Sequence, residues 1–290
     1  MNSRNTKACN PNNKLLDTND SYMVNLKEYK IIRELKSGGF GTVYLIKDKF
    51  NTYFAAKVNH FQGSEKYSLL NRREINILIQ IQHPTIVEFI GYSNKDFNGF
   101  DKTTIIMKYM SKGSLSDLIE KEIKGSCPYD YDNTKRQIIL IGIARGMMIL
   151  HGQNVIHRDL KPANVLLDNN YYPCITDFGL SKFYDPNHSM EQSEFQIGTL
   201  TYMAPEVLEG LEYNEKADVY SFGILMYEVL NSTKAYQTDI DKKLTALALA
   251  NKIKNGYRPT FTVNVNRALI DLVERCWSMN ISKRPTFSEI

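Results

Sequence analysis

The stretch VIHRDLKPANVLLD, residues 155 to 168, carries side chains that are well suited to phosphate and metal chemistry. It places Asp159 and Asn164 five positions apart, directly after a His-Arg pair. A carboxylate can accept the proton of a hydroxyl group, and an amide oxygen can bind magnesium without adding charge. A second acidic residue, Asp177, follows in TDFGL just before Phe-Gly. Together these residues indicate metal-assisted phosphate chemistry.

Residues 36 to 44 read KSGGFGTVY, which is close to a phosphate-binding glycine loop. Lys36 stands where the first glycine of a G-x-G-x-x-G pattern falls. A glycine cluster between two strands is more often a plain hairpin turn, so the loop alone is a weak signal. In FAAKV, Lys57 ends a strand-like run, and a lone lysine on a strand is usually solvated.

The elements that must position these residues are strand-like in the first part of the chain. Three alternating runs between residues 29 and 59, IIREL, TVYLIKD and TYFAAKVN, predict a three-strand meander. A helix is expected next, with Ser64 as its candidate cap, and His83-Pro84 ends it. Two more strand-like runs, IVEFIGY and TTIIMKYM, follow.

The pattern becomes helical after residue 113. Ser114 and Asp117 have the spacing of a capping box, and Asn133 is expected to cap a long apolar helix that runs to His151. Further helices are expected over residues 218–231, 244–255 and 267–277. The sequence therefore predicts an α+β protein with a strand-rich N-terminal half, a helix-rich C-terminal half and a cleft between them.

The composition excludes several classes of protein. The chain has 290 residues, 42% of them hydrophobic, and a formal net charge of +4 without a dense Lys/Arg run, which argues against a nucleic-acid binder. The four cysteines lie far apart and have no zinc-ligand spacing, so we expect free thiols in a reducing compartment. No apolar stretch is long enough to span a bilayer. We therefore expect a cytoplasmic protein without a membrane span, in which residues 1–25 are a disordered extension.

Taken together, these motifs resemble the eukaryotic protein kinase family from about Tyr29 to Ile290. The motifs are a glycine loop ending in GTV, Ala-Ala-Lys at 55–57, Arg-Glu-Ile at 73–75, HRDLKPAN, DFG, GTLTYMAPE at 198–206, DVYSFG at 218–223 and KRPTF at 283–287. YMSKGSL, GLSKF and the CW before KRPTF are most similar to the tyrosine-kinase-like group of Ser/Thr kinases.

The resemblance implies a two-lobed kinase domain over residues 26–290. A small antiparallel-sheet N-lobe with one main helix would occupy about 26–108, a hinge 108–113, and a larger, mainly helical C-lobe 114–290. The sequence stops inside what should be the last helix of the C-lobe, which leaves open that it is an excised domain of a longer protein.

The resemblance also implies roles for the catalytic residues. Lys57 would bind the α and β phosphates of ATP and pair with Glu74. Asp159 would accept the proton of the substrate hydroxyl, and Lys161 would steady the transferred phosphoryl group. Magnesium, with manganese as an alternative, would be held by two oxygen ligands, Asn164 and Asp177.

The nucleotide itself would lie in an apolar slot, with hinge backbone groups reading the edge of adenine. The residues implied are Leu35, Gly38, Gly41, Val43, Ala55, Lys57, Met107, Lys108, Tyr109, Met110 and Leu166. Met107 would be the gatekeeper and narrow the rear pocket. A Cβ at Gly38 or Gly41 would intrude where the backbone approaches the phosphates, whereas the Lys36 side chain is expected to point outwards and to change ATP affinity only slightly.

Outside the cleft, the resemblance implies structural contacts. His157 and Phe178 would stack with Leu78 in the core between the lobes. Asp218 would brace the catalytic loop, and Glu206 would pair with Arg284.

Regulation would act through the activation segment, because Arg158 stands where the family usually binds a phosphate on that segment. The regulatory residues implied are Arg158, Lys182, Ser189, Ser193 and Thr199, with Ser193 the favoured phosphorylation site, Ser189 second, and Thr199 within the substrate-groove motif. The alternative is that Glu191 or Glu194 already supplies the anion.

The function implied is an ATP-dependent protein serine/threonine kinase, since Lys161 and Thr199 follow the Ser/Thr pattern. A pseudokinase scaffold, a dual-specificity kinase and a small-molecule phosphotransferase are the alternatives. The intact catalytic residues argue against the scaffold, and GTLTYMAPE argues against the small-molecule enzyme. The protein substrate and the oligomeric state stay open.

Overall fold

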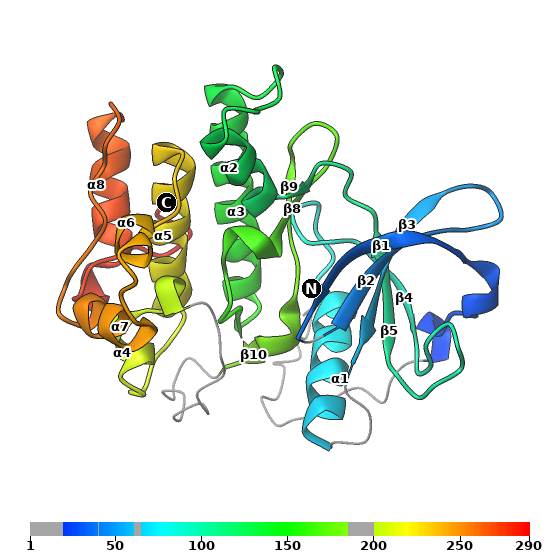
Figure 1. Ribbon diagram of the computed structural model, residues 1–290. Helices are drawn as coiled ribbons and strands as arrows, with labels where there is room; N and C mark the ends of the chain where they lie inside the picture. The colour runs from blue at the N-terminus through cyan, green and yellow to red at the C-terminus, as the bar shows by residue number, and fades with distance from the viewer. Residues whose placement is uncertain (1–19, 40, 61–64, 185–199) are drawn as a thin grey trace, which may run out of the picture.

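A computed structural model describes residues 20–39, 41–60, 65–184 and 200–290 (Figure 1). The chain forms a sheet-rich N-lobe and a larger helical C-lobe (Figure 1), so the expected two-lobed α+β fold is confirmed. The N-lobe elements are β1 (Lys30–Gly38), β2 (Gly41–Lys47), β3 (Tyr53–Asn59), α1 (Glu65–Gln80), β4 (Phe89–Ser93) and β5 (Thr104–Lys108). Short 3-10 turns at Asp20–Tyr22 and Leu26–Glu28 precede them.

The five strands form one antiparallel sheet in the order β1-β2-β3-β5-β4. Side chains alternate between its faces, as in any strand. Ala56 of β3 is therefore buried on one face with Ile46 of β2 and Ile106 of β5. Its neighbours Ala55 and Lys57 face the other way, toward the cleft between the lobes. The predicted meander of three strands is confirmed.

The C-lobe is built around helices with three small strand pairings. Its elements are β6 (Gly113–Ser114), α2 (Leu115–Ile123), α3 (Asn133–Gly152), β7 (Val155–Ile156), β8 (Val165–Leu167), β9 (Pro173–Ile175), β10 (Lys182–Phe183), α4 (Pro205–Leu208), α5 (Lys216–Asn231), α6 (Gln237–Asp241), α7 (Ala246–Lys254) and α8 (Arg267–Cys276). Short 3-10 turns lie at Pro162–Asn164, Phe178–Leu180, Leu200–Tyr202 and Ile281–Lys283. Almost every side chain of α5 is buried, as is typical of a helix at the centre of a lobe.

Helix caps show where local sequence was sufficient and where it was not. The Ser114 and Asp117 capping box at the start of α2 is confirmed. The expectation that Asn133 caps α3 is wrong by one residue, because Asp132 has extended backbone angles and accepts the Lys135 N–H, while Asn133 is already helical. Both residue types are good caps, so their order along the chain could not decide between them. Ser64 lies outside the described residues.

One buried ion pair ties distant parts of the C-lobe together. The Arg284 guanidinium binds both carboxylate oxygens of Glu206 in α4, at 2.5 and 2.8 Å, and this confirms the expected pair. Cys127, Cys174 and Cys276 are free thiols. Across the described part of the chain, no helix is both long and apolar enough to cross a membrane.

Candidate active site

A cleft of about 890 Å³ lies between the lobes. Strands β1 to β3 line one side of the cleft, and residues 107–114 line its inner edge. The other side is lined by β8 and by the segment between β7 and β8, residues 157–164, which we call the catalytic loop. It brings together all the residues implied for the nucleotide, namely Leu35, Gly38, Gly41, Val43, Ala55, Lys57, Met107, Lys108, Tyr109, Met110 and Leu166. The cleft therefore offers an apolar surface from each lobe, and the segment that connects the lobes forms its inner edge.

The inner edge of the cleft has an unused backbone donor. The Met110 N–H has no hydrogen-bond partner among the described residues, whereas the neighbouring Lys108 N–H is bonded to the Glu88 carbonyl at 3.0 Å. A backbone donor that faces an apolar slot is suited to a flat heteroaromatic ring with a polar edge. The buried side chain of Met107 closes the slot beside it. These features fit adenine.

The glycines of the hairpin between β1 and β2 differ in what they require. A Cβ on Gly41 would lie 2.5 Å from the Val58 carbonyl oxygen, so the protein itself needs glycine there. At Gly38 no atom of the described residues lies within 4 Å of such a Cβ. We expected a Cβ to intrude at both glycines. Within the described residues, such a Cβ would contact protein atoms only at Gly41. Lys36 is exposed, as expected, but it also lines the mouth of the cleft.

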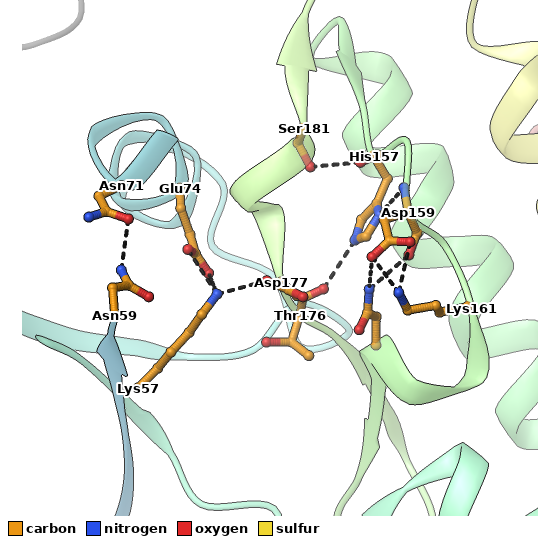
Figure 2. Close-up of polar contacts among 11 residues, drawn as sticks. Lys57, Asn59, Asn71, Glu74, His157, Asp159, Lys161, Thr176, Asp177 and Ser181 are labelled. Carbon is orange, nitrogen blue, oxygen red and sulfur yellow. Dashed lines mark hydrogen bonds and ion pairs between the residues drawn. The ribbon is translucent and has the colours of Figure 1, made fainter. Parts of the chain in front are cut away.

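Lys57 joins the two lobes through carboxylates on either side (Figure 2). Its Nζ lies 2.8 and 3.0 Å from the two oxygens of Glu74 in α1, and 2.7 Å from Oδ1 of Asp177. The Asn59 amide at the end of β3 donates to Asn71 of α1 at 2.8 Å, which fixes the helix against the strand that carries Lys57. The helix thus holds Glu74 toward the cleft.

These contacts set the charge of the site. Burial alone would lower the pKa of Lys57, but the negative charges of Asp177 and Glu74 outweigh it and raise the pKa above its usual value. The positive charge of Lys57 lowers the pKa of Asp177 in spite of burial. At neutral pH Lys57 is therefore a cation and Asp177 an anion.

The catalytic loop holds Asp159 by its own neighbours. Lys161 Nζ lies 2.9 and 2.7 Å from the two carboxylate oxygens, and Asn164 Nδ2 donates to Oδ2 at 2.9 Å and to the Asp159 carbonyl at 2.8 Å. The amide oxygen of Asn164 is left without a hydrogen bond from any described residue. The loop therefore fixes one carboxylate while it keeps one oxygen ligand free.

The loop is braced from behind by Asp218 at the start of α5. Its carboxylate accepts the backbone N–H groups of His157 and Arg158, both at 2.8 Å, and lies 2.9 Å from Nε2 of His151. Burial would raise the pKa of Asp218, but the contacts with His151 and His157 lower it, so it stays ionised. Arg158 has a φ of 70°, which is a left-handed backbone conformation. The two hydrogen bonds from the His157 and Arg158 N–H groups to Asp218 stabilise it. The bracing role expected for Asp218 is confirmed.

A second set of contacts positions Asp177 (Figure 2). The His157 ring packs edge-on against the Phe178 ring, as expected, with 5.3 Å between the ring centroids. Its Nε2 is hydrogen-bonded to the Thr176 carbonyl at 3.1 Å. Ser181 is buried and donates to the His157 carbonyl at 3.1 Å. The segment from Thr176 to Ser181 is thereby attached to the catalytic loop on both sides of Asp177.

Two oxygens in the cleft fit a magnesium ion. Asn164 Oδ1 and Asp177 Oδ2 receive no hydrogen bond from the described residues, and both residues line the cleft. Magnesium is typically held by one or two protein oxygens, with phosphate oxygens and water completing its shell. Within the described ranges no cluster of three or more His, Cys, Asp or Glu side chains could hold a metal alone. The donor set thus suits a metal that arrives with a phosphate.

The regulatory residues are only partly placed. Arg158 lies with its guanidinium 5.8 Å from the Tyr213 ring, and Lys182 is exposed on β10. The three hydroxyl residues implied, Ser189, Ser193 and Thr199, lie outside the described residues. Sequence reasoning missed Arg73 of α1, whose pKa is lowered by burial and by the nearby charge of Arg158. Its place directly before Glu74 was the available signal.

Comparison with known proteins agrees with this geometry. The sequence matches the protein kinase domain family over residues 29–290. It is 34% identical over 92% of its length to a probable serine/threonine-protein kinase of Dictyostelium discoideum, covering 19% of that protein. It is 33% identical over 94% of its length to the Arabidopsis thaliana serine/threonine-protein kinase STY46, covering 45% of it.

A third relative is the Arabidopsis thaliana serine/threonine/tyrosine-protein kinase HT1, 36% identical over 76% of the chain and 52% of HT1. The chain thus spans about half or less of the length of these relatives. The plant kinases among them agree with the resemblance to the tyrosine-kinase-like group. With the catalytic motifs assembled around one cleft, the chain belongs to the protein kinase domain family.

Proposed function

We propose that the chain is a protein serine/threonine kinase that transfers the γ-phosphate of ATP to hydroxyl groups of protein substrates, with magnesium or manganese as cofactor. The observation that carries the proposal is the bridge from Glu74 through Lys57 to Asp177, which brings a strand, a helix and the metal-binding segment of the other lobe to one point. Relatives of the chain are named as serine/threonine-protein kinases.

Each residue of the site has a defined task in this reaction. Lys57, held in direction by Glu74, binds the α and β phosphates, and Asn164 and Asp177 supply the oxygen ligands of the metal. When it is bound, Mg-ATP would supply the phosphoryl group, and its magnesium ion would neutralise part of the charge of the phosphates. Asp159 orients the substrate hydroxyl and accepts its proton.

Asp159 is well placed for this task. Its side chain is only 12% exposed, and its carboxylate is held by Lys161 and Asn164. A fixed carboxylate accepts a proton without having to reorganise, which is the main way in which such sites lower a barrier. Lys161 lies within 3 Å of the same carboxylate and carries the charge that can follow the transferred phosphoryl group.

The decisive experiment is the Asp159→Asn variant, with the exposed loop variant Asp101→Asn as control. Phosphate transfer from radiolabelled ATP to a generic protein substrate should fall by roughly 10²–10⁴ in the first variant and stay unchanged in the second. Thermal stabilisation by ATP and magnesium should persist in both, because the carboxylate acts on the hydroxyl. Near wild-type turnover in Asp159→Asn would refute the assignment.

Two alternatives are separated by the same assay. A scaffold without catalysis would show no transfer in the wild type, although Lys57, Glu74, Asp159, Asn164 and Asp177 are all present and oriented. A dual-specificity kinase is the second candidate, because HT1 is named as a serine/threonine/tyrosine kinase. Phosphoamino-acid analysis of the product distinguishes it from a serine/threonine kinase.

Regulation by phosphorylation is part of the proposal. Arg158 and Arg73 approach each other closely enough for their charges to interact, and this arrangement favours a bound anion. Phosphorylated Ser193, or Ser189 in its place, would supply that anion, with Lys182 as a further cation. Mass spectrometry after incubation with ATP and magnesium should find the phosphate, and Ser193→Ala should slow transfer. A fully active enzyme without this modification would exclude the mechanism.

We also propose a cytoplasmic location. It is supported by the free thiols of the three described cysteines, since a reducing compartment keeps cysteines unpaired.

A further inference from the structure

The mouth of the cleft carries more positive than negative side chains. Its lining includes eight Lys and Arg residues but only three Asp and Glu residues. The three acidic ones are already engaged. Asp177 pairs with Lys57, Asp117 accepts the Ser114 N–H and hydroxyl at 2.9 and 2.7 Å, and Glu120 lies 2.6 Å from Lys234 Nζ. Each lining carboxylate therefore already has a hydrogen-bond or ion-pair partner, and the second oxygen of Asp177 is the one suited to a metal ion.

The positive side chains divide into an inner and an outer group. In the inner group, Lys57 and Lys161 contact carboxylates of the site, and Lys108 and Lys112 pair with acidic residues beside it. The outer group consists of Lys36 of β1, and Lys121 and Lys124 at the C-terminal end of α2. We refer to these three as the cleft-mouth lysines.

The cleft-mouth lysines are exposed, and no hydrogen bond or ion pair within 4 Å joins their ammonium groups to a described residue. The contact with Lys234 mainly lowers the pKa of the Glu120 carboxyl group, and Lys124 lies close enough to Glu120 for its charge to help. Arg33, which also lines the mouth, donates to the backbone carbonyl of Glu34. Exposed cations without partners at the rim of a concave site raise the local concentration of anions and attract them into it.

The position of these lysines relates them to the acceptor hydroxyl. Helix α2 packs against the 3-10 turn Pro162–Asn164, and Asn164 is hydrogen-bonded to Asp159. Lys121 and Lys124, at the C-terminal end of this helix, therefore belong to the same lobe as Asp159, and they line the same cleft as Lys161 and Asn164. Lys36 lines the same cleft from the N-lobe. A peptide chain that presents a hydroxyl to Asp159 has this basic rim beside it.

We propose that the cleft-mouth lysines select protein substrates in which acidic residues lie near the phosphorylated hydroxyl. The proposal rests on the kinase function proposed above and adds its substrate class. The competing occupant is the nucleotide, whose phosphates are also anionic. Lys57 and Lys161 are the proposed phosphate contacts, and Lys108 and Lys112 pair with acidic residues, so the outer lysines are available for the peptide.

The test compares three short peptides with one central serine, flanked by neutral residues, by glutamates on the N-terminal side, or by glutamates on the C-terminal side. One acidic peptide should have a kcat/KM about five- to tenfold above the neutral one, since each exposed ion pair contributes a factor of about 1.4 to 5. The preference should shrink as salt rises from 50 to 500 mM, because exposed charges are screened.

The double variant Lys121→Ala/Lys124→Ala should bring the ratio of acidic to neutral kcat/KM close to one. The matched control is Lys95→Ala/Lys283→Ala, two exposed lysines that do not line the cleft, and it should keep the ratio. A second measurement does not depend on turnover. Fluorescence anisotropy with the serine replaced by alanine should show tighter binding of the acidic peptide to the wild type than to the double variant.

Several results would overturn the proposal. Equal affinity of the wild type for acidic and neutral peptides would overturn the proposal, even in a protein that transfers no phosphate. Equal kcat/KM for acidic and neutral peptides would also overturn it, but it would leave the kinase function standing. An increase in the KM for ATP in the double variant, with the peptide ratio unchanged, would assign these lysines to the nucleotide instead.

Discussion

Glu228 in α5 provides a test of how the C-lobe responds to pH. Its side chain is buried, and its carboxylate accepts the Tyr202 hydroxyl at 2.9 and 2.8 Å and the Ala235 N–H at 2.8 Å. Burial raises its pKa from 4.5 to about 7, although these hydrogen bonds and the charge of Lys234 oppose the rise. The folded protein therefore prefers a protonated Glu228 at pH values where the unfolded chain has it ionised.

The magnitude follows from the difference between the two pKa values. A difference of about 2.5, at 1.36 kcal/mol for each pH unit, corresponds to about 3.4 kcal/mol. Because the folded pKa is the higher one, this stabilisation is fully present below pH 4.5 and is lost as pH rises through 7. About 2.5 kcal/mol of it should disappear between pH 5 and pH 8.

The assay is urea unfolding of the wild type and of Glu228→Gln at pH 5, 6, 7 and 8. Glutamine keeps an oxygen that can accept from Tyr202 and Ala235, but it does not titrate in this range. The free energy of unfolding of the wild type should therefore fall by about 2.5 kcal/mol relative to the variant between pH 5 and pH 8. The contributions of the other titrating groups are the same in both proteins, so they cancel in this difference. Parallel pH profiles of the two proteins would refute the reasoning.

Three further changes test the packing and the catalytic bridge. Arg284→Leu leaves Glu206 buried without its partner and should cost about 3–5 kcal/mol in urea unfolding; a cost no larger than for an exposed arginine of α8 would contradict this. Gly41→Ala forces a Cβ to 2.5 Å from a β3 carbonyl and should cost about 1–3 kcal/mol, whereas Gly38→Ala should cost less than about 1; equal losses would contradict the packing argument. Glu74→Gln weakens the lysine bridge and should lower turnover about tenfold in the radiolabel assay, which corresponds to about 1.4 kcal/mol; unchanged turnover would show that the pair has no catalytic part.

Much of the fold could be predicted because its signals are local. The alternation of apolar residues in the first strands sets which side chains face the core, and the capping box at Ser114 depends on two residues three positions apart. The catalytic loop is local too, since Lys161 and Asn164 both contact Asp159 and lie within five positions of it. For such features the local sequence was sufficient to predict both the residues and their contacts.

Other features depend on where the chain returns to itself. Lys57 and Asp177 are 120 positions apart, and their ion pair exists only because β3 and the segment after β9 meet at the cleft. The cap of α3 is Asp132 and not Asn133 because Asp132 has extended backbone angles whereas Asn133 is already helical, and the residue types alone do not show this.

The tertiary structure also decided which charges are available at the cleft. Along the sequence, Glu120, Lys121 and Lys124 are three charged residues at the end of one helix, and none stands out as free or paired. The fold places Lys234 of the distant α5–α6 connection against Glu120, and it leaves the two lysines exposed at the mouth of the cleft. Whether a charge is neutralised depends on partners within about 4 Å in space, because Coulomb attraction at a protein surface is strong only at such distances. Spacing along the chain carries this information only within a helix or a turn, so the charge of the site was determined by the folding of the whole domain.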